Sequence, residues 1–254
     1  MEKFLHEDFL LNNESGRILY HDYAKKMPIF DYHNHLVPQQ IAEDKKFENL
    51  ARIWLDGDHY KFRLMRAFGI DEKYITGDAP DYDKYMAWAR TVPYTIGNCV
   101  YQWIHMELKN PFGITGKLLS PDTAEEIWKT VNSLLPKDEY SACSIIRRMN
   151  VKAICTTDDP VDSLEHHKSI RDNNNDFVVV PTFRPDKAMA AENPADWNTY
   201  RQKLEEASGI SINSFESFMS AIEKRHDFFH SMGARATDHA LVFPFAEECS
   251  KKEL

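Results

Sequence analysis

Two histidines separated by one residue give the clearest chemical signal in the sequence. His33 and His35 lie in the run Phe-Asp-Tyr-His-Asn-His-Leu, directly after apolar residues. We predict a β-strand over residues 28–33, and side chains two apart on a strand point to the same face. Two imidazoles on one face can bind one metal ion, as in zinc, iron and manganese sites. A pair of surface histidines beside a turn is the competing interpretation, because this short spacing is weak by itself.

Arg184 and Asp238 are candidates because each follows a predicted strand. A guanidinium directly after an apolar strand can bind a carboxylate through two hydrogen bonds. An ion pair with Asp186 or another nearby acid is the alternative role for Arg184. A helix cap is the alternative role for Asp238, which His239 follows.

Two other polar pairs favour structural interpretations. Asp159 precedes Pro160 and fits the cap of a helix that opens directly after a strand, whereas Asp158 is ambiguous. His166 and His167 fit a solvated helix face, so we do not count them as metal ligands.

Strand-like segments alternate with helix-like segments, which predicts a parallel sheet. The predicted strands cover residues 28–33, 151–156 and 177–182, with a fourth inside residues 235–242. Parallel neighbours need a crossover, usually a helix. The polar candidates follow the strands, and in a (β/α) barrel those ends form the active-site face.

Three helices have readable ends. Ser120 and Pro121 predict a helix start that Pro136 terminates. A second helix is predicted from about Asn213, with Glu216 completing a capping box and Gly233 at the carboxyl end. A third is predicted over residues 60–68.

The predicted fold is α/β, an incomplete TIM-type (β/α) barrel. Residues 36–150 show no clear strand and read as a mainly helical insertion after the first strand, within one partial barrel domain over residues 1–254. About four strands fit, against the eight that close a barrel. Residues 250–254 resemble the beginning of a helix. We therefore expect a half-barrel from a fragment or a truncated product.

Composition excludes several classes of protein. The net charge of -9 and the absence of a Lys/Arg block argue against nucleic-acid binding. No run approaches the roughly 18 apolar residues that span a membrane, and the acidic N-terminus is unlike a signal peptide. The four cysteines form no Cys-x-x-Cys pair and are expected to be reduced, buried residues of a cytoplasmic protein.

Several stretches resemble known families. Residues 30–36 resemble the first-strand signature of the amidohydrolase superfamily, and further stretches, in family order, resemble one member, the uronate (glucuronate) isomerases. These stretches are Trp-Leu-Asp-Gly-Asp-His-Tyr-Lys at 54–61 with Arg-Leu-Met-Arg at 63–66, Cys-Thr-Thr-Asp-Asp-Pro at 155–160, Pro-Thr-Phe-Arg-Pro-Asp at 181–186 and Ala-Thr-Asp-His-Ala-Leu at 236–241.

The resemblance implies interconversion of D-glucuronate and D-fructuronate, and of D-galacturonate and D-tagaturonate. In this aldose–ketose isomerisation a divalent metal polarises substrate oxygens and an acid–base group moves a proton through an enediol. Zinc is the expected metal, with manganese and iron as alternatives, and a small uronate sugar is the expected partner. The implied site has His33 and His35 as metal ligands, Asp238 as the catalytic residue, and substrate-binding side chains at His59, Tyr60 and Arg184. Ordinary packing at the start of a helix is the alternative role for His59 and Tyr60.

One departure from the family limits the expected activity. The superfamily's metal-binding Asp follows the eighth strand, which this chain does not contain, and two histidines alone hold a metal weakly. We therefore expect the chain alone to be inactive. The alternatives are a metal-dependent hydrolase, although no Lys follows Asp238-His239 closely, and a non-catalytic half-barrel that self-associates as a homo-oligomer to cover an open strand edge.

Overall fold

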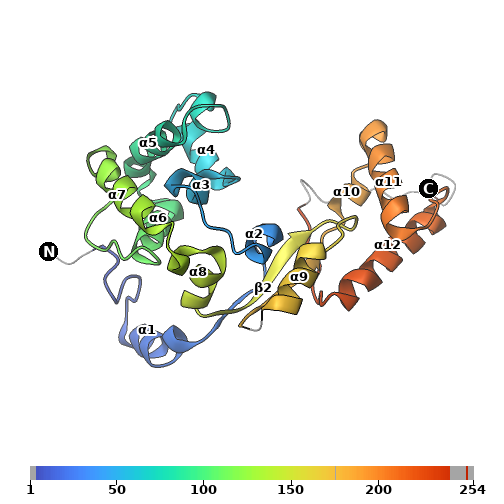
Figure 1. Ribbon diagram of the computed structural model, residues 1–254, viewed down its shortest axis with the longest axis horizontal. Coiled ribbons are helices and arrows are strands. Elements are labelled where there is room, and N and C mark those ends of the chain that lie inside the picture. Colours follow the sequence, from blue (N-terminus) through green and yellow to red (C-terminus); the bar gives the residue numbers. More distant parts are fainter. Residues whose placement is uncertain (1–3, 175, 241–249, 251–254) are drawn as a thin grey trace. The chain divides into compact units, whose positions relative to one another are not determined.

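The computed structural model describes residues 4–174, 176–240 and 250, and they divide into two compact units (Figure 1). One unit comprises Met1–Pro28 and Asp44–Asn150, and we call it the helical unit. The other comprises Ile29–Glu43 and Val151–Leu254, and we call it the sheet unit. The predicted insertion over residues 36–150 thus shares most of its length with the helical unit. The view that residues 36–150 are an insertion within one partial barrel domain stays a prediction.

The helical unit has its own apolar core. Tyr85 and Trp88 are fully buried there, and the Tyr85 hydroxyl donates to the Ala124 carbonyl at 2.8 Å. Its helices are α1 Glu14–Ile18, α3 Leu50–Leu55, α4 His59–Ala67, α5 Asp81–Thr91, α6 Cys99–Lys109, α7 Pro121–Leu134 and α8 Ala142–Arg148. Its short π and 3-10 turns are η1 Leu19–Tyr23, η2 Ala24–Lys26, η3 Glu72–Tyr74, η4 Val92–Thr95 and η5 Asp138–Tyr140.

In the described part of the sheet unit, three parallel strands pair in the order β1-β2-β3. The strands are β1 Ile29–Asp31, β2 Val151–Asp158 and β3 Val178–Phe183. The helices are α2 Pro38–Ala42, α9 Glu165–Asn173, α10 Asp186–Met189, α11 Pro194–Ser208 and α12 Phe215–Ser231. The prediction of an α/β arrangement with parallel strands is confirmed, and β2 and β3 lie close to their predicted positions.

The predicted fourth strand does not form within the described residues, and positions 241 and 242 lie outside them. Thr237 makes a single parallel bridge to Phe183, the last residue of β3. Before this segment, the chain passes from the end of α12 through Gly233. Gly233 lies close to β3, because a Cβ added there would be 3.0 Å from the Val180 side chain. The segment therefore reaches the sheet only at the end of β3.

Helix ends follow local capping rules, with one correction. At α7, Thr123 Oγ1 accepts the Ser120 N–H at 3.0 Å, and Pro121 begins the helix as predicted. At α12 the cap is Ser214 with Ser217 in place of Glu216, because the Ser217 hydroxyl lies 3.0 Å from the Ser214 N–H. The helix at the third predicted position is α4, one residue earlier at each end.

Two composition-based expectations are also tested. Cys99, Cys143 and Cys155 are free, and Cys143 is buried as predicted. Cys99 is exposed at the first residue of α6 and Cys155 is only partly buried, so the predicted burial is wrong for these two. Cys249 lies outside the described residues. Among the described residues, no helix is both long and apolar enough to cross a membrane.

Candidate functional site

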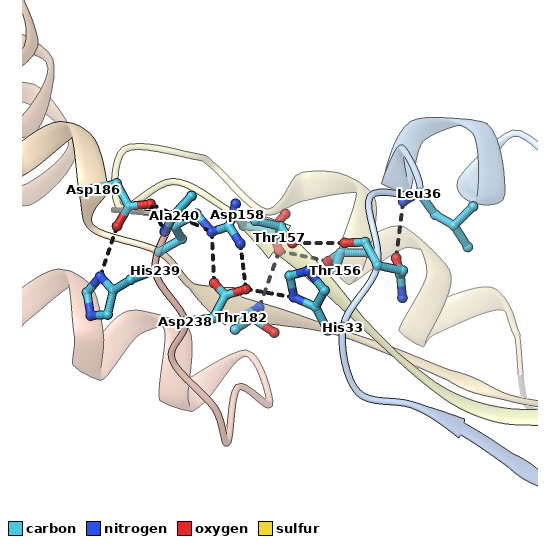
Figure 2. A network of polar contacts seen from close by, with 12 residues as sticks. His33, Leu36, Thr156, Thr157, Asp158, Thr182, Asp186, Asp238, His239 and Ala240 are labelled. Atoms are coloured by element: carbon cyan, nitrogen blue, oxygen red, sulfur yellow. Dashed lines mark hydrogen bonds and ion pairs between the residues drawn. The ribbon is translucent and has the colours of Figure 1, made fainter. Parts of the chain in front are cut away.

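Polar side chains of the sheet unit gather where β2 and β3 end (Figure 2). The backbone N–H of Arg184 donates to the Asp158 carbonyl, which fixes the residue after β3 against the end of β2. The Arg184 side chain forms a two-pronged pair with Asp238, with Nε 2.9 Å from Oδ1 and Nη2 2.7 Å from Oδ2. The ion pair that the sequence left open for Arg184 therefore exists, with Asp238 as the principal partner.

This pair sets the charge of Asp238. The hydrogen bonds from Arg184 lower the pKa of Asp238 below its ordinary range, the charges of Arg184 and His33 act in the same direction, and partial burial opposes them. Asp238 is therefore an ionised acceptor near neutral pH. A guanidinium has five N–H donors, so Arg184 keeps three beyond the two that bind Asp238.

His33 also contacts Asp238. Its Nδ1 lies 2.7 Å from Asp238 Oδ2, so the ionised carboxylate makes Nδ1 the donor. The His33 and His35 rings are edge-to-face with centroids 5.2 Å apart. The placement of both histidines on the first strand is wrong, because β1 ends at Asp31. Beyond that point the Asn34 carbonyl accepts a hydrogen bond from the Thr157 hydroxyl at 2.8 Å, so the chain has left the ladder.

Imidazole is a suitable ligand for zinc, manganese or iron, but two histidines are fewer ligands than a stable site uses. With Nδ1 of His33 facing Asp238, its Nε2 is the nitrogen left for a metal, an arrangement typical of metal-binding histidines. Stable zinc sites use three or four protein ligands. Within the described part of the chain, no three His, Cys, Asp or Glu side chains are grouped to hold a metal.

Asp186 is a site residue that sequence reasoning considered only as a partner of Arg184. Its Oδ1 lies 2.9 Å from Nδ1 of His239, and its Oδ2 accepts the Ala240 N–H at 2.6 Å. The distance to Arg184 Nε is longer, 3.9 Å. The sequence signals for this role are its position two residues after Arg184 and its place at the end of the family-like stretch over residues 181–186.

A buried polar cluster lies at the end of β2. The Thr156 hydroxyl is 2.7 Å from Asp158 Oδ2 and 2.8 Å from His167 Nε2. The prediction of a solvated His167 is wrong, because α9 turns this side chain toward β2 and leaves it only 3% exposed. Burial raises the pKa of Asp158 to about 6 and lowers that of His167 to about 4, since it disfavours both charged forms.

Asp159 does not cap a helix, which corrects that prediction. Residues 159–162 form a turn, and α9 begins only at Glu165. Asp159 Oδ1 instead accepts the Tyr200 hydroxyl at 2.7 Å, and Oδ2 lies 3.2 Å from Lys187 Nζ.

His59 and Tyr60 belong to the helical unit, at the start of α4. Asp58 caps this helix by accepting the N–H groups of Tyr60 and Lys61, each at 3.0 Å. The His59 and Tyr60 rings have centroids 4.4 Å apart, and Tyr60 is 53% exposed. The first turn of α4 thus presents an accessible aromatic surface, while substrate binding by the two residues stays a prediction.

Comparisons with known proteins agree with one another. The sequence profile of one protein family, described as glucuronate isomerase, matches residues 1–254. The chain is 52% identical to the uronate isomerase of Caldanaerobacter subterraneus subsp. tengcongensis over 254 residues, which is all of this chain and 54% of that protein. It is 50% identical to the uronate isomerase of Bacteroides thetaiotaomicron, again over all of this chain and 54% of the relative. The chain thus spans about half the length of these curated relatives.

Solved structures show the same similarity. The crystal structure of uronate isomerase from Thermotoga maritima superimposes with a TM-score of 0.91 at 37% identity, over 98% of this chain and 54% of that one. Glucuronate isomerase from Caulobacter crescentus gives a TM-score of 0.88 over the same shares of the two chains, and its 24% identity supports the fold alone.

Proposed function

We propose, on the premise that this chain belongs to the glucuronate isomerase family, that it forms part of an enzyme interconverting D-glucuronate and D-fructuronate. D-galacturonate and D-tagaturonate are the second proposed pair. The three parallel strands are then proposed to belong to a (β/α) barrel, in keeping with polar residues that gather at strand ends. A cytoplasmic location is part of the same proposal.

The observation that carries the proposal is the Arg184–Asp238 pair. Arg184 is held by two hydrogen bonds at the end of β3 and is 19% exposed in its side chain. Its three remaining N–H donors can bind the carboxylate that distinguishes a uronate from a neutral sugar. Because the guanidinium is already oriented, little additional side-chain entropy is lost when an anion binds.

His33 and His35 are the residues that would hold a divalent metal. When bound, the metal would act as a Lewis acid on the sugar oxygens. Asp238 Oδ2 keeps the proton of His33 on Nδ1 and so leaves Nε2 as a lone-pair donor. This geometry supports the proposed ligand role for His33.

Asp238 itself is proposed to orient groups and not to remove a proton. Isomerisation takes the C2 proton and the O2 proton of the open-chain aldose, and adds one at C1 and one at O1. A carboxylate whose pKa is lowered by Arg184 is a weak base for the C2 proton. Its hydrogen bonds suit it to hold Arg184, His33 and a sugar hydroxyl. We expect this chain by itself to bind a uronate without turnover, since two imidazoles hold a metal weakly.

Ligand titration by NMR tests the proposal. We expect D-glucuronate to bind the full chain more tightly than D-glucose does, and R184M to weaken binding of D-glucuronate about tenfold, as expected for loss of a charge-assisted pair. R171M is the matched control, because Arg171 is an exposed residue of α9. Equal binding of D-glucuronate by R184M and the unmodified chain would reject Arg184 as the carboxylate site.

A further inference from the structure

The Asp186 side chain binds the two residues that directly follow Asp238. One of its carboxylate oxygens lies 2.9 Å from the His239 ring and the other accepts the Ala240 N–H at 2.6 Å (Figure 2). Asp186 is the first residue of α10, and its side chain is 22% exposed. Arg184 and Asp186 therefore hold neighbouring residues of one segment, Arg184 through the side chain of Asp238 and Asp186 through His239 and Ala240.

In the part of the chain that the structure describes, two backbone hydrogen bonds join this segment to β3. The Phe183 N–H donates to the Ala236 carbonyl at 3.2 Å, and the Asp238 N–H donates to the Phe183 carbonyl at 3.3 Å. Among the described residues it forms a single bridge and no strand. The backbone on the N-terminal side of Asp238 is thus held by the end of β3, and the backbone on its C-terminal side is held by Asp186.

We propose that Asp186 is a positioning residue of this site. It holds the backbone around Asp238 so that the carboxylate meets Arg184 with both oxygens and His33 with Oδ2. The inference rests on the proposed function, because it assigns Asp186 to the same site. Asp186 acts through Asp238 and touches no reacting atom in this role.

An electrostatic role and a positioning role predict different results when Asp186 is substituted. Its Oδ2 lies 3.9 Å from Arg184 Nε, so a purely electrostatic role would depend on its negative charge. In D186N the amide keeps an acceptor for the Ala240 N–H and a donor for the His239 ring, but loses the charge. In D186A both hydrogen bonds are lost. Positioning therefore predicts that D186N resembles the unmodified chain and D186A does not.

The experiment follows the two tautomers of the His33 ring by 15N NMR in the full, metal-free chain at alkaline pH. In the unmodified chain and in D186N we expect the Nδ1–H form to predominate, because ionised Asp238 accepts that proton. In D186A we expect the ratio of the Nδ1–H form to the Nε2–H form to fall about tenfold, as for loss of a hydrogen bond to a charged group. H239A removes one of the two Asp186 contacts and should give an intermediate ratio.

Zinc titration supplies a second readout. We expect D186A to bind Zn²⁺ about tenfold more weakly than the unmodified chain, the size seen when an outer-shell residue is removed. The matched control is D196A, which removes another first-turn carboxylate of the sheet unit that accepts a side-chain hydrogen bond, here from Asn193 at 2.6 Å. D196A should change neither the His33 ratio nor zinc binding.

Two results would overturn the inference. One is a D186A chain whose His33 ratio and zinc binding match those of the unmodified chain. The other is a D186N chain that behaves like D186A, which would assign Asp186 an electrostatic role. If D186A does not fold, the same measurements are made on H239A and D186N. An unchanged His33 ratio in H239A, or a lowered ratio in D186N, would then overturn the inference. None of these measurements uses a uronate, so failure of the proposed function is recognised separately, by equal D-glucuronate binding in R184M.

Discussion

The two units bury their apolar residues to different extents. Among the described residues, the helical unit packs a large cluster in which Trp88, Tyr85 and Met65 are fully buried. In the described part of the sheet unit, buried clusters form around Leu204 and around Phe229, and the strands leave apolar side chains accessible: Phe30 is 66% exposed and Val178 is 57% exposed. Dense apolar packing is thus the main feature of the helical unit. In the sheet unit, hydrogen bonds and ion pairs connect the side chains at the strand ends.

The comparison also separates two kinds of functional candidate. His59 and Tyr60 stand at the start of a helix whose cap and core are complete within its own unit. Arg184, Asp238 and His33 are ordered by one another, because each lies in a loop or at the end of a strand. We therefore expect substitutions in the helical core to change stability most, and substitutions in the network to change local geometry and pH dependence.

The largest expected effect is a cavity in the helical unit. W88A should lower the free energy of unfolding of this unit by about 3–5 kcal/mol, as for other aromatic-to-alanine changes in cores. Hydrogen exchange should show faster exchange for amides of α5 and α7. W88F is the control and should cost less, because the Trp88 indole N–H has no hydrogen-bond partner among the residues that the structure describes and most of the ring is kept. Unchanged exchange in α5 and α7 of W88A would contradict the central place given to Trp88.

A smaller, pH-dependent effect is expected from the buried cluster in the sheet unit. Asp158 has a pKa raised from 3.8 to about 6, so its contribution to stability is complete below 3.8 and is lost as pH rises through 6. His167 has a pKa lowered from 6.5 to about 4, so its contribution is complete above 6.5 and is lost as pH falls through 4. Between about pH 4 and 6 the two dependences are opposite and nearly cancel.

Single substitutions should expose each half of this balance. Relative to the unmodified chain, D158N should lose stability as pH falls from 6 to 4, and H167Q should gain it, each by up to about 1.4 kcal/mol per pH unit. Denaturant unfolding at a series of pH values measures both slopes. Parallel pH profiles for all three chains would show that the pair does not titrate in this window.

The smallest expected effect concerns a two-pronged Arg–carboxylate pair that occurs in both units. Arg66 and Glu72 in the helical unit form the same two-pronged pair as Arg184 and Asp238, at 2.9 and 2.5 Å, but both side chains are about half exposed. Solvent screening makes such surface pairs weak. We expect E72Q to leave the melting temperature nearly unchanged at physiological salt, and D238N to lower it measurably. An equal or larger drop for E72Q would mean that exposure does not separate the pairs.

Local sequence was sufficient for much of the fold. The apolar runs placed β2 and β3 almost correctly, because buried strands need such runs. Ser120 and Pro121 located the start of α7, since capping depends only on neighbouring residues. The short β1 and the single bridge at Thr237 could not be read in the same way, because each depends on how long a partner strand stays within hydrogen-bonding distance.

The sequence by itself determined the residue types of the site, the position of Arg184 directly after a strand, and the family resemblance that the comparisons confirmed. Only the tertiary structure decided which of these side chains meet. Asp238 accepts from Arg184, 54 residues away, and lies against His33 from the first loop of the sheet unit. His167 became buried because α9 faces β2 with that side of its helix. The physical reason is that caps and strands follow from neighbouring residues, whereas an ion pair forms only between groups that chain packing has brought within a few ångströms.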